Sequence, residues 1–130
     1  MVGVVIVSHS QKVAEGIREM ALQMARPGQQ IIAAGGMDNG GIGTDVNKVS
    51  EAISIANTGD GVVVLVDLGS AVMTTDTVLE LLGEESKEKI KIADAPILEG
   101  AISAVVEASL GSSLATVVAT AEGARNLKKC

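Results

Sequence analysis

The sequence predicts a single α/β domain over residues 1–130. We expect an open, mainly parallel sheet of about four strands in the order 2-1-3-4, with helices on both faces. Short aliphatic runs alternate along the chain with longer segments whose apolar residues recur at helical spacing. The aliphatic runs are almost continuously apolar, which is typical of parallel strands covered on both faces. Right-handed crossovers make 2-1-3-4 the simplest order, with the winding reversed between strands 1 and 3.

The first predicted strand covers residues 2–7, which are rich in Val and Ile. A helical pattern over residues 13–24 follows, and Ser10 is placed to cap the start of this helix. We assign Met20 and Met24 to the side of the helix that packs in the core.

The second predicted strand, residues 30–34, leads into a loop over residues 35–44 that contains five glycines. An apolar stripe over residues 46–56 predicts the second helix. Either Thr44 or Asp45 has the right side chain and position to cap that helix.

The third predicted strand, residues 62–66, is the most strand-like run of the chain. We expect Ser70 to cap the helix that follows, which spans residues 71–82 and turns Leu82 inward. The segment 84–91 is mostly charged, and we assign no helix to it.

A brief fourth strand, residues 90–93, and two helices complete the predicted fold. Apolar residues recur at helical spacing over residues 98–106 and again over residues 114–124. Residues 111–113, Gly-Ser-Ser, separate these two helices.

Composition excludes several classes of function. The chain has a net charge of −6, no basic block and no aromatic residue, which argues against nucleic-acid binding. No apolar stretch approaches the roughly 20 residues that cross a membrane. Cys130 is the only cysteine, so no internal disulfide forms, which fits a reducing cytoplasm. With one histidine and one cysteine, zinc ligation lacks ligands, and we predict no bound metal.

The strongest functional signal is the pairing of His9 with Asp67. His9 follows the first strand, Asp67 follows the third, and these two strands are neighbours in the predicted sheet. Open α/β sheets bind ligands at such a switch point, beside the carboxyl ends of the strands. A carboxylate on one imidazole nitrogen fixes the tautomer and leaves the other nitrogen, here Nε2, as a nucleophile. The sequence therefore predicts that His9 accepts and passes on a phosphoryl group.

Three segments near this point offer N–H groups to phosphoryl oxygens: two helix starts, where anions bind well, and the glycine-rich loop. Their candidate residues are Ser10, Gln11, Lys12, Gly69, Ser70, Gly41, Gly43 and Thr44. Simpler interpretations stay open. The loop glycines can be present only because turns need their positive φ values. Asp67 can act only as a helix cap, and His9 can have a structural role.

Residues 5–16, VIVSHSQKVAEG, resemble the active-site segment of the mannose-type enzyme IIA domains of the phosphoenolpyruvate-dependent phosphotransferase system. Within that group, Gly41–Thr44 and Val66–Ala71 are most similar to the phosphocarrier subunit of the phosphoenolpyruvate-dependent dihydroxyacetone kinase. The resemblance implies a phosphotransferase that works through a phosphohistidine. The histidine matching His9 accepts phosphate at Nε2 from the carrier protein HPr, with the aspartate matching Asp67 beside it. It passes the phosphate to ADP on the nucleotide-binding kinase subunit, and a second kinase subunit binds dihydroxyacetone.

The resemblance also implies a cytoplasmic homodimer. We expect no cofactor or nucleotide on this chain, with Mg²⁺ belonging to the kinase partner. Because the sequence shows no HPr-like region after residue 130, we expect a separate HPr as donor. Two alternatives remain open: an enzyme IIA of a mannose-type sugar transporter, which passes phosphate to a IIB domain, and a non-catalytic regulatory α/β module.

Overall fold

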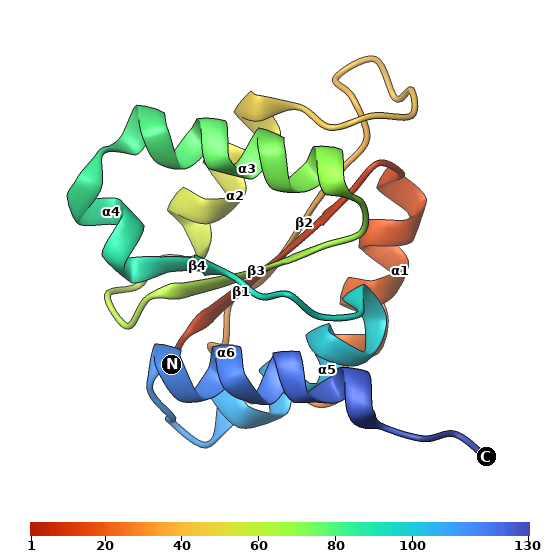
Figure 1. Cartoon of the computed structure of the whole chain (residues 1–130), viewed down its shortest axis with the longest axis vertical. Helices are drawn as coiled ribbons and strands as arrows, with labels where there is room; N and C mark the ends of the chain where they lie inside the picture. The colour runs from red at the N-terminus through yellow and green to blue at the C-terminus, as the bar shows by residue number, and fades with distance from the viewer.

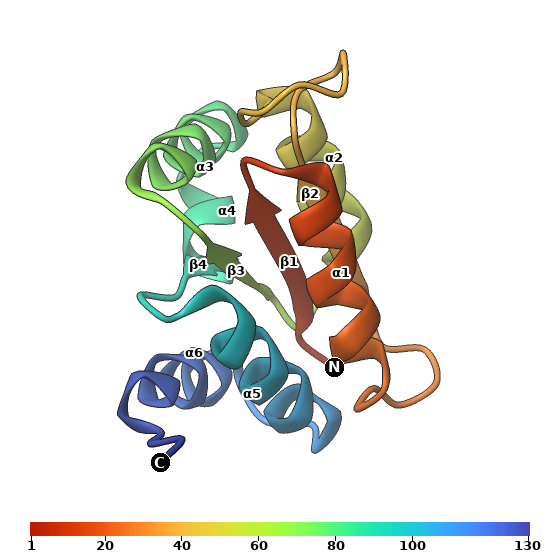
Figure 2. The same cartoon turned by 90° about the vertical axis from the view of Figure 1, so that its right-hand side faces the viewer.

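The computed structural model describes residues 1–130 and has a four-stranded parallel sheet between two layers of helices (Figures 1 and 2). The strand order is β2-β1-β3-β4, so the predicted order is confirmed. The strands are β1 (Gly3–Ser8), β2 (Ile31–Gly35), β3 (Val62–Val66) and β4 (Ile90–Ile92).

The helices divide between the two faces of the sheet, as Figure 2 shows. On one face pack α1 (Gln11–Leu22), α5 (Ile97–Ser109) and α6 (Leu114–Gly123), which is followed by the 3₁₀ turn η1 (Ala124–Asn126). On the other face pack α2 (Val46–Ala56) and α3 (Gly69–Leu82), while the short helix α4 (Glu84–Lys89) joins α3 to β4.

Alternation along the strands explains why both faces are covered. In β1, Val4 and Ile6 pack under α1 and α5, whereas Val5 and Val7 pack under α2 and α3. All four side chains are fully buried. The near-continuous apolar runs of the sequence are therefore a direct consequence of burial on both sides.

Strand register brings the functional end of the sheet together. Val7 of β1 lies opposite Val66 of β3, so the two strands reach the same edge at the same level. On the other side, Ser8 lies opposite Gly35 of β2. Gly35 has no room for a side chain, since a Cβ there would lie 2.6 Å from the Ser10 carbonyl oxygen. That close approach lets α1 begin directly beside β2.

Two of the predicted helix caps are confirmed and one is wrong. The Ser10 hydroxyl accepts a hydrogen bond from the N–H of Val13 in α1. The Asp45 carboxylate, not Thr44, caps α2. Ser70 does not cap α3, because the helix already begins at Gly69 and Ser70 lies inside its first turn.

Three apolar residues assigned to the interior are exposed. Met20 is 52% exposed, because the buried face of α1 is a narrow stripe made of Ala14, Ile17 and Ala21. Met24 is 51% exposed and lies in the turn beyond the end of α1. Leu82 is 43% exposed, since it ends α3 just before the chain turns away at a Gly83 with positive φ.

The charged segment after α3 is a helix that the sequence analysis did not assign. In α4 the acidic Glu84 and Glu85 stand in the first turn and the basic Lys87 and Lys89 in the last, which suits the helix dipole. Lys87 also forms ion pairs with Glu80 and Glu84. No residue of α4 is buried, so the helix carries none of the apolar periodicity that would have revealed it.

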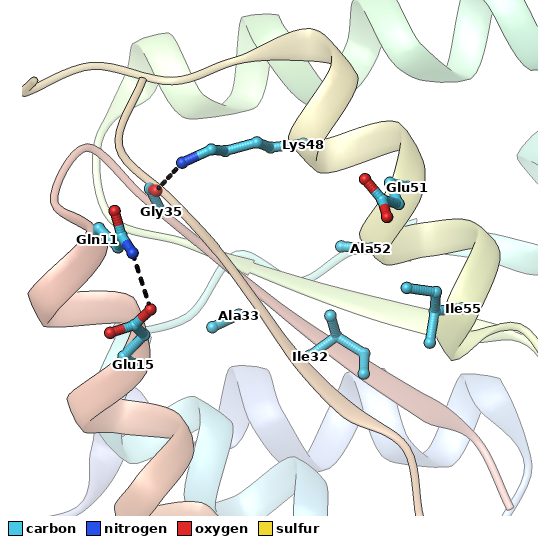
Figure 3. A pocket seen from close by; sticks show the side chains of 9 residues that line it. All are labelled: Gln11, Glu15, Ile32, Ala33, Gly35, Lys48, Glu51, Ala52 and Ile55. Atoms are coloured by element: carbon cyan, nitrogen blue, oxygen red, sulfur yellow. Dashed lines mark hydrogen bonds between the residues drawn. The ribbon is translucent and has the colours of Figure 1, made fainter. Parts of the chain in front are cut away.

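The free edge of β2 is protected by two basic side chains. Arg18 of α1 donates to the carbonyl of Ile31, and Lys48 of α2 donates to the carbonyl of Gly35. These contacts occupy carbonyls that a further strand would need. Figure 3 shows the pocket beside this edge, walled by α1 and α2, with the Lys48 contact drawn. Neither His9 nor Asp67 lines this pocket. No helix of the chain is both long enough and apolar enough to span a membrane.

Candidate functional site

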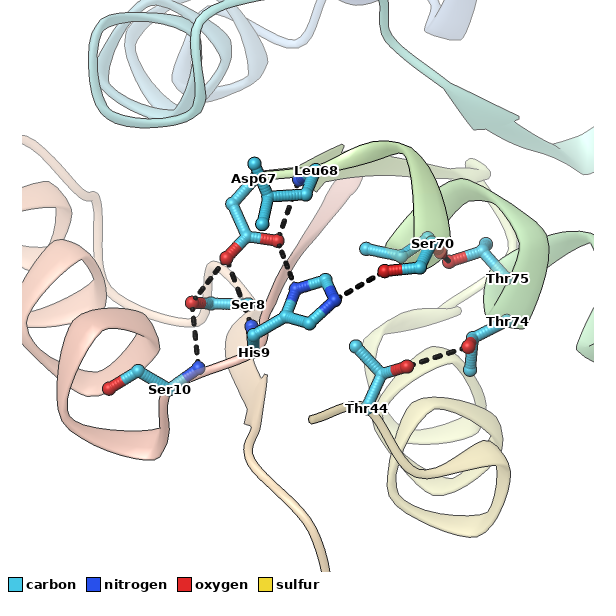
Figure 4. Close-up of polar contacts among 10 residues, drawn as sticks. Ser8, His9, Ser10, Thr44, Asp67, Leu68, Ser70, Thr74 and Thr75 are labelled. Atoms are coloured by element: carbon cyan, nitrogen blue, oxygen red, sulfur yellow. Dashed lines mark hydrogen bonds and ion pairs between the residues drawn. The ribbon is translucent and has the colours of Figure 1, made fainter. Parts of the chain in front are cut away.

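His9 and Asp67 meet at the carboxyl ends of β1 and β3, as the strand order predicts. Nδ1 of the imidazole lies 2.8 Å from Oδ1 of the carboxylate, and each side chain is 19% exposed (Figure 4). His9 stands one residue after β1 and Asp67 one residue after β3, so neighbouring strands aim both side chains at one point.

The Asp67 carboxylate accepts hydrogen bonds on both oxygens. Oδ1 accepts from the His9 ring and from the N–H of Leu68, and Oδ2 accepts from the N–H of His9 and the hydroxyl of Ser8. Burial alone would raise the pKa of this carboxyl. The bonds from His9, Ser8 and Leu68 together outweigh burial and hold the pKa of Asp67 below its ordinary 3.8. Asp67 is therefore a carboxylate at neutral pH.

A carboxylate at Nδ1 determines the protonation of the His9 ring. Because the carboxylate only accepts hydrogen bonds, Nδ1 carries the proton, and Nε2 of the neutral ring keeps its lone pair. Nε2 lies 2.5 Å from the hydroxyl oxygen of Ser70, which donates to it in this tautomer. Nε2 thus faces the first turn of α3.

The start of α3 is suited to an anion. Its N-cap residue, Leu68, has no side chain that can accept hydrogen bonds, so no side chain caps the first-turn N–H groups of Gly69 and Ser70. The positive end of the helix dipole adds to the attraction for negative charge. Of the predicted phosphoryl-binding residues, Ser70 contacts Nε2 through its hydroxyl, and Gly69 precedes it at the start of the same helix.

The start of α1 is arranged differently. The Ser10 N–H donates to the hydroxyl of Ser8, and the Ser10 hydroxyl is used as the cap of its own helix. Gln11 turns its side chain to Glu15, while Lys12 is exposed. None of Ser10, Gln11 and Lys12 has a hydrogen bond to the His9 ring, and Figure 4 shows Ser10 on the side away from Ser70.

The glycine-rich loop supports the site through the main chain. The N–H of Gly43 donates to the carbonyl of His9, and the N–H of Gly41 donates to the side chain of Asn39. The Thr44 hydroxyl pairs with that of Thr74 at 2.6 Å, which ties the loop to α3. Both predicted glycine donors are therefore used inside the protein, which favours the interpretation that the loop glycines serve turns.

One polar residue at the site was not predicted. Ser8 ends β1, is fully buried, and hydrogen-bonds to Asp67. The signal for it was available, because a serine closes an otherwise aliphatic strand directly before His9. No group of three or more His, Cys, Asp or Glu side chains gathers where it could hold a metal ion.

Comparison with known proteins identifies the family. Residues 3–118 match the model of EIIA-man, described as the PTS system fructose IIA component, where PTS denotes the phosphotransferase system. The chain belongs to the EIIA-man family.

Relatives of this EIIA-man chain include subunits of dihydroxyacetone kinases. The phosphoryl donor subunit DhaM of PEP-dependent dihydroxyacetone kinase 2 from Listeria innocua is 38% identical over 113 residues, covering 87% of this chain and 90% of the relative. The phosphoryl donor subunit DhaM from Escherichia coli is 40% identical over 132 residues, covering 99% of this chain. This chain spans only 28% of the length of the Escherichia coli protein.

Two solved structures share the EIIA-man fold. The crystal structure of the unknown-function protein EF1359 has a TM-score of 0.84 at 31% identity and matches over 95% of each chain. The phosphotransferase system component EIIA from Streptococcus agalactiae has a TM-score of 0.71 at 17% identity, over 99% of this chain and 97% of that one.

Proposed function

We propose that this chain is the phosphoryl donor subunit of a phosphoenolpyruvate-dependent dihydroxyacetone kinase. In this proposal, His9 accepts a phosphoryl group from the phosphohistidine of HPr and passes it to ADP on the nucleotide-binding kinase subunit. The observation that carries the proposal is a His9 ring whose Nδ1 is held by the Asp67 carboxylate while Nε2 faces the uncapped start of α3. The Listeria and Escherichia relatives, which are phosphoryl donor subunits of dihydroxyacetone kinases, support the choice of system.

The first step forms a bond between Nε2 of His9 and phosphorus. The Nε2 lone pair attacks in line, and the bond from phosphorus to the donor ring breaks, with its electron pair returning to the donor nitrogen. The donor leaves as neutral imidazole when its other nitrogen is protonated. Positive charge then develops on the His9 ring, where the Asp67 carboxylate stabilises it across the 2.8 Å hydrogen bond.

Ser70 changes partner in this step. Its hydroxyl hydrogen-bonds to Nε2 before transfer, so it has to rotate away for the lone pair to reach phosphorus. After transfer, the hydroxyl and the first-turn N–H groups of Gly69 and Ser70 donate to the phosphoryl oxygens.

The second step reverses the bonding at His9. A β-phosphate oxygen of ADP attacks phosphorus, the bond to Nε2 breaks, and its electron pair returns to Nε2. The neutral ring with a proton on Nδ1 is restored. Mg²⁺ and dihydroxyacetone belong to the kinase partners in this proposal, which needs no cofactor on this chain. A separate HPr, a homodimer and a cytoplasmic location remain predictions from the resemblance.

The alternative acceptor is the IIB domain of a sugar transporter, which the family description as a fructose IIA component favours. The dihydroxyacetone kinase subunits, at 38% and 40% identity, favour the kinase acceptor. Both acceptors use the same phosphohistidine, so they differ only after His9 is loaded.

A phosphate-transfer assay tests the proposal in two stages. The wild-type chain, incubated with labelled phosphoenolpyruvate, enzyme I and HPr, should gain an acid-labile, base-stable label that His9→Ala lacks. Label in His9→Ala would reject the assignment of His9, and an unlabelled wild type would favour a non-catalytic module. In the second stage, the loaded chain should lose its label to kinase subunits holding ADP. Transfer only to a IIB domain would identify a transporter component.

A further inference from the structure

We infer that Ser8 is a positioning residue, which fixes the Asp67 carboxylate and through it the His9 ring for phosphoryl transfer. The inference rests on the proposed function of His9 and adds a residue to the site. Ser8 touches neither the reacting nitrogen nor the place that the phosphoryl group would take, so it acts only through Asp67.

The contacts of the Ser8 hydroxyl are unusual for the end of a core strand. Ser8 is fully buried, and its oxygen lies 2.9 Å from Oδ2 of Asp67 and 3.1 Å from the N–H of Ser10 (Figure 4). A carboxylate accepts only, so the hydroxyl donates to Asp67 and accepts from Ser10. One buried group thus joins the loop after β1 to the carboxylate after β3.

The geometry indicates what this bond does. Oδ2 of Asp67 is held by Ser8 and by the N–H of His9, which leaves Oδ1 to meet Nδ1 of His9 and the N–H of Leu68. Hydrogen bonds at both oxygens restrict rotation of the carboxylate about its Cβ–Cγ bond. Without the Ser8 hydroxyl, Oδ2 keeps only the N–H of His9 as a partner. The carboxylate can then rotate more freely, and Oδ1 is held less firmly against the ring.

A purely structural role is the competing explanation, since any buried hydroxyl needs partners. The two roles differ in what the Ser8→Ala variant changes. A positioning role lowers the maximal transfer rate and leaves the KM for phosphorylated HPr unchanged, because docking does not involve Ser8. We expect the rate to fall about tenfold, the lower end of the loss caused by removing an outer hydrogen bond to a metal ligand.

A matched control is available in Ser109→Ala. The Ser109 hydroxyl is also buried and donates to the carbonyl of Val106, near the end of α5. This variant removes a buried hydroxyl that has no contact with His9 or Asp67, and it should transfer phosphate at the wild-type rate. Ser8→Cys covers the case in which Ser8→Ala does not fold, because it keeps a side chain of similar size with a weak donor. Its rate should lie between those of the wild type and Ser8→Ala.

The deciding experiment combines Ser8→Ala with Asp67→Ala. If Ser8 acts through Asp67, the double variant is no slower than Asp67→Ala alone, because the group that Ser8 positions is already gone. A further tenfold loss in the double variant would overturn the inference.

Nitrogen NMR of the His9 ring gives a readout that needs no transfer. We expect a smaller share of the tautomer protonated at Nδ1 in Ser8→Ala than in the wild type, and an unchanged share in Ser109→Ala. An unchanged tautomer ratio in Ser8→Ala would count against positioning. A wild type that takes up no phosphate would reject the proposed function, while the NMR result would still decide the role of Ser8.

Discussion

The Ser70 hydroxyl lies 2.5 Å from Nε2 of His9, at the end of the ring opposite the nitrogen that Asp67 holds. The imidazole is therefore hydrogen-bonded at both nitrogens, to residues that stand one and four positions after the end of β3. Asp67 contributes a fixed charge and Ser70 a rotatable hydroxyl. This asymmetry leads to different expectations for the two residues.

Replacement of Ser70 by alanine removes one donor to the transferred phosphoryl group. In Ser70→Ala we expect the rate at saturating phosphorylated HPr to fall by about ten- to a hundredfold, somewhat less than for a fully enclosed oxyanion site because this position is open to solvent. Stopped-time labelling measures the rate. Ser70→Thr keeps the hydroxyl and should stay within a few-fold of the wild type. An unchanged or faster rate in Ser70→Ala would show that the hydroxyl does not assist transfer.

Replacement of Asp67 by alanine separates function from folding. The ring loses the partner that fixes its tautomer, so we expect transfer to slow by about a hundredfold, a loss typical of general acid–base and charge-stabilising groups. Asp67 lies in a loop and supports no apolar core contact, so circular dichroism should still show the folded chain. Loss of the folded signal at room temperature would assign Asp67 a mainly structural role.

The lowered pKa of Asp67 predicts how stability depends on pH. The pKa of this carboxyl is below 3.8 in the folded chain, so the folded state holds the charged form more strongly than the unfolded state does. The resulting stabilisation is fully present above about pH 4 and is lost as the pH falls through the folded pKa. Urea unfolding between pH 7 and pH 3 should therefore show a smaller acid-induced loss in Asp67→Ala than in the wild type. Parallel curves would contradict this expectation.

The protected edge of β2 predicts a change in self-association. The double variant Arg18→Ala/Lys48→Ala removes both side-chain donors. The carbonyls of Ile31 and Gly35 are then free to pair with another strand. Light scattering should show a mass that rises with concentration above that of the wild type. Lys128→Ala, which removes a charge from the exposed carboxyl-terminal segment, serves as the control and should behave like the wild type.

An exposed apolar residue near the site offers a test of partner docking. Met73 of α3 is 70% exposed and stands one turn after Ser70. Leu110 is similarly exposed, at 72%, but follows the far end of α5. We expect Met73→Glu to raise the KM for phosphorylated HPr several-fold, because a charge replaces exposed apolar surface one turn from Ser70, and Leu110→Glu to leave it unchanged. Equal effects of the two variants would place the docking surface elsewhere.

Much of the fold could be predicted because burial and strand order leave a clear record in the sequence. The aliphatic runs predicted β1 to β4, and the crossover rule then placed His9 beside Asp67. The Ser10 and Asp45 caps were also predictable, since each precedes a helical stripe.

The features that the sequence analysis missed depend on helix boundaries and on contacts between distant residues, which apolar periodicity does not show. Met20 lies outside the buried stripe of α1, which is made of Ala14, Ile17 and Ala21, although it shares the helical spacing of apolar residues. Ser70 was predicted to cap α3, but the helix begins at Gly69 with no side-chain cap, so Ser70 lies within its first turn. The position of Ser8 directly before His9 was a usable signal, but its partner Asp67 lies 59 positions away and becomes evident only in the folded chain.

The complete occupation of Asp67 has a consequence for the lifetime of a charged carrier. A carboxylate with a spare lone pair beside phosphohistidine is well placed to pull a proton from water and so promote hydrolysis. Both oxygens of Asp67 already accept two hydrogen bonds each, so the group is a poor base for water. In the proposed phosphohistidine, Asp67 would therefore do little to promote hydrolysis, and the phosphoryl group would persist until an acceptor protein binds.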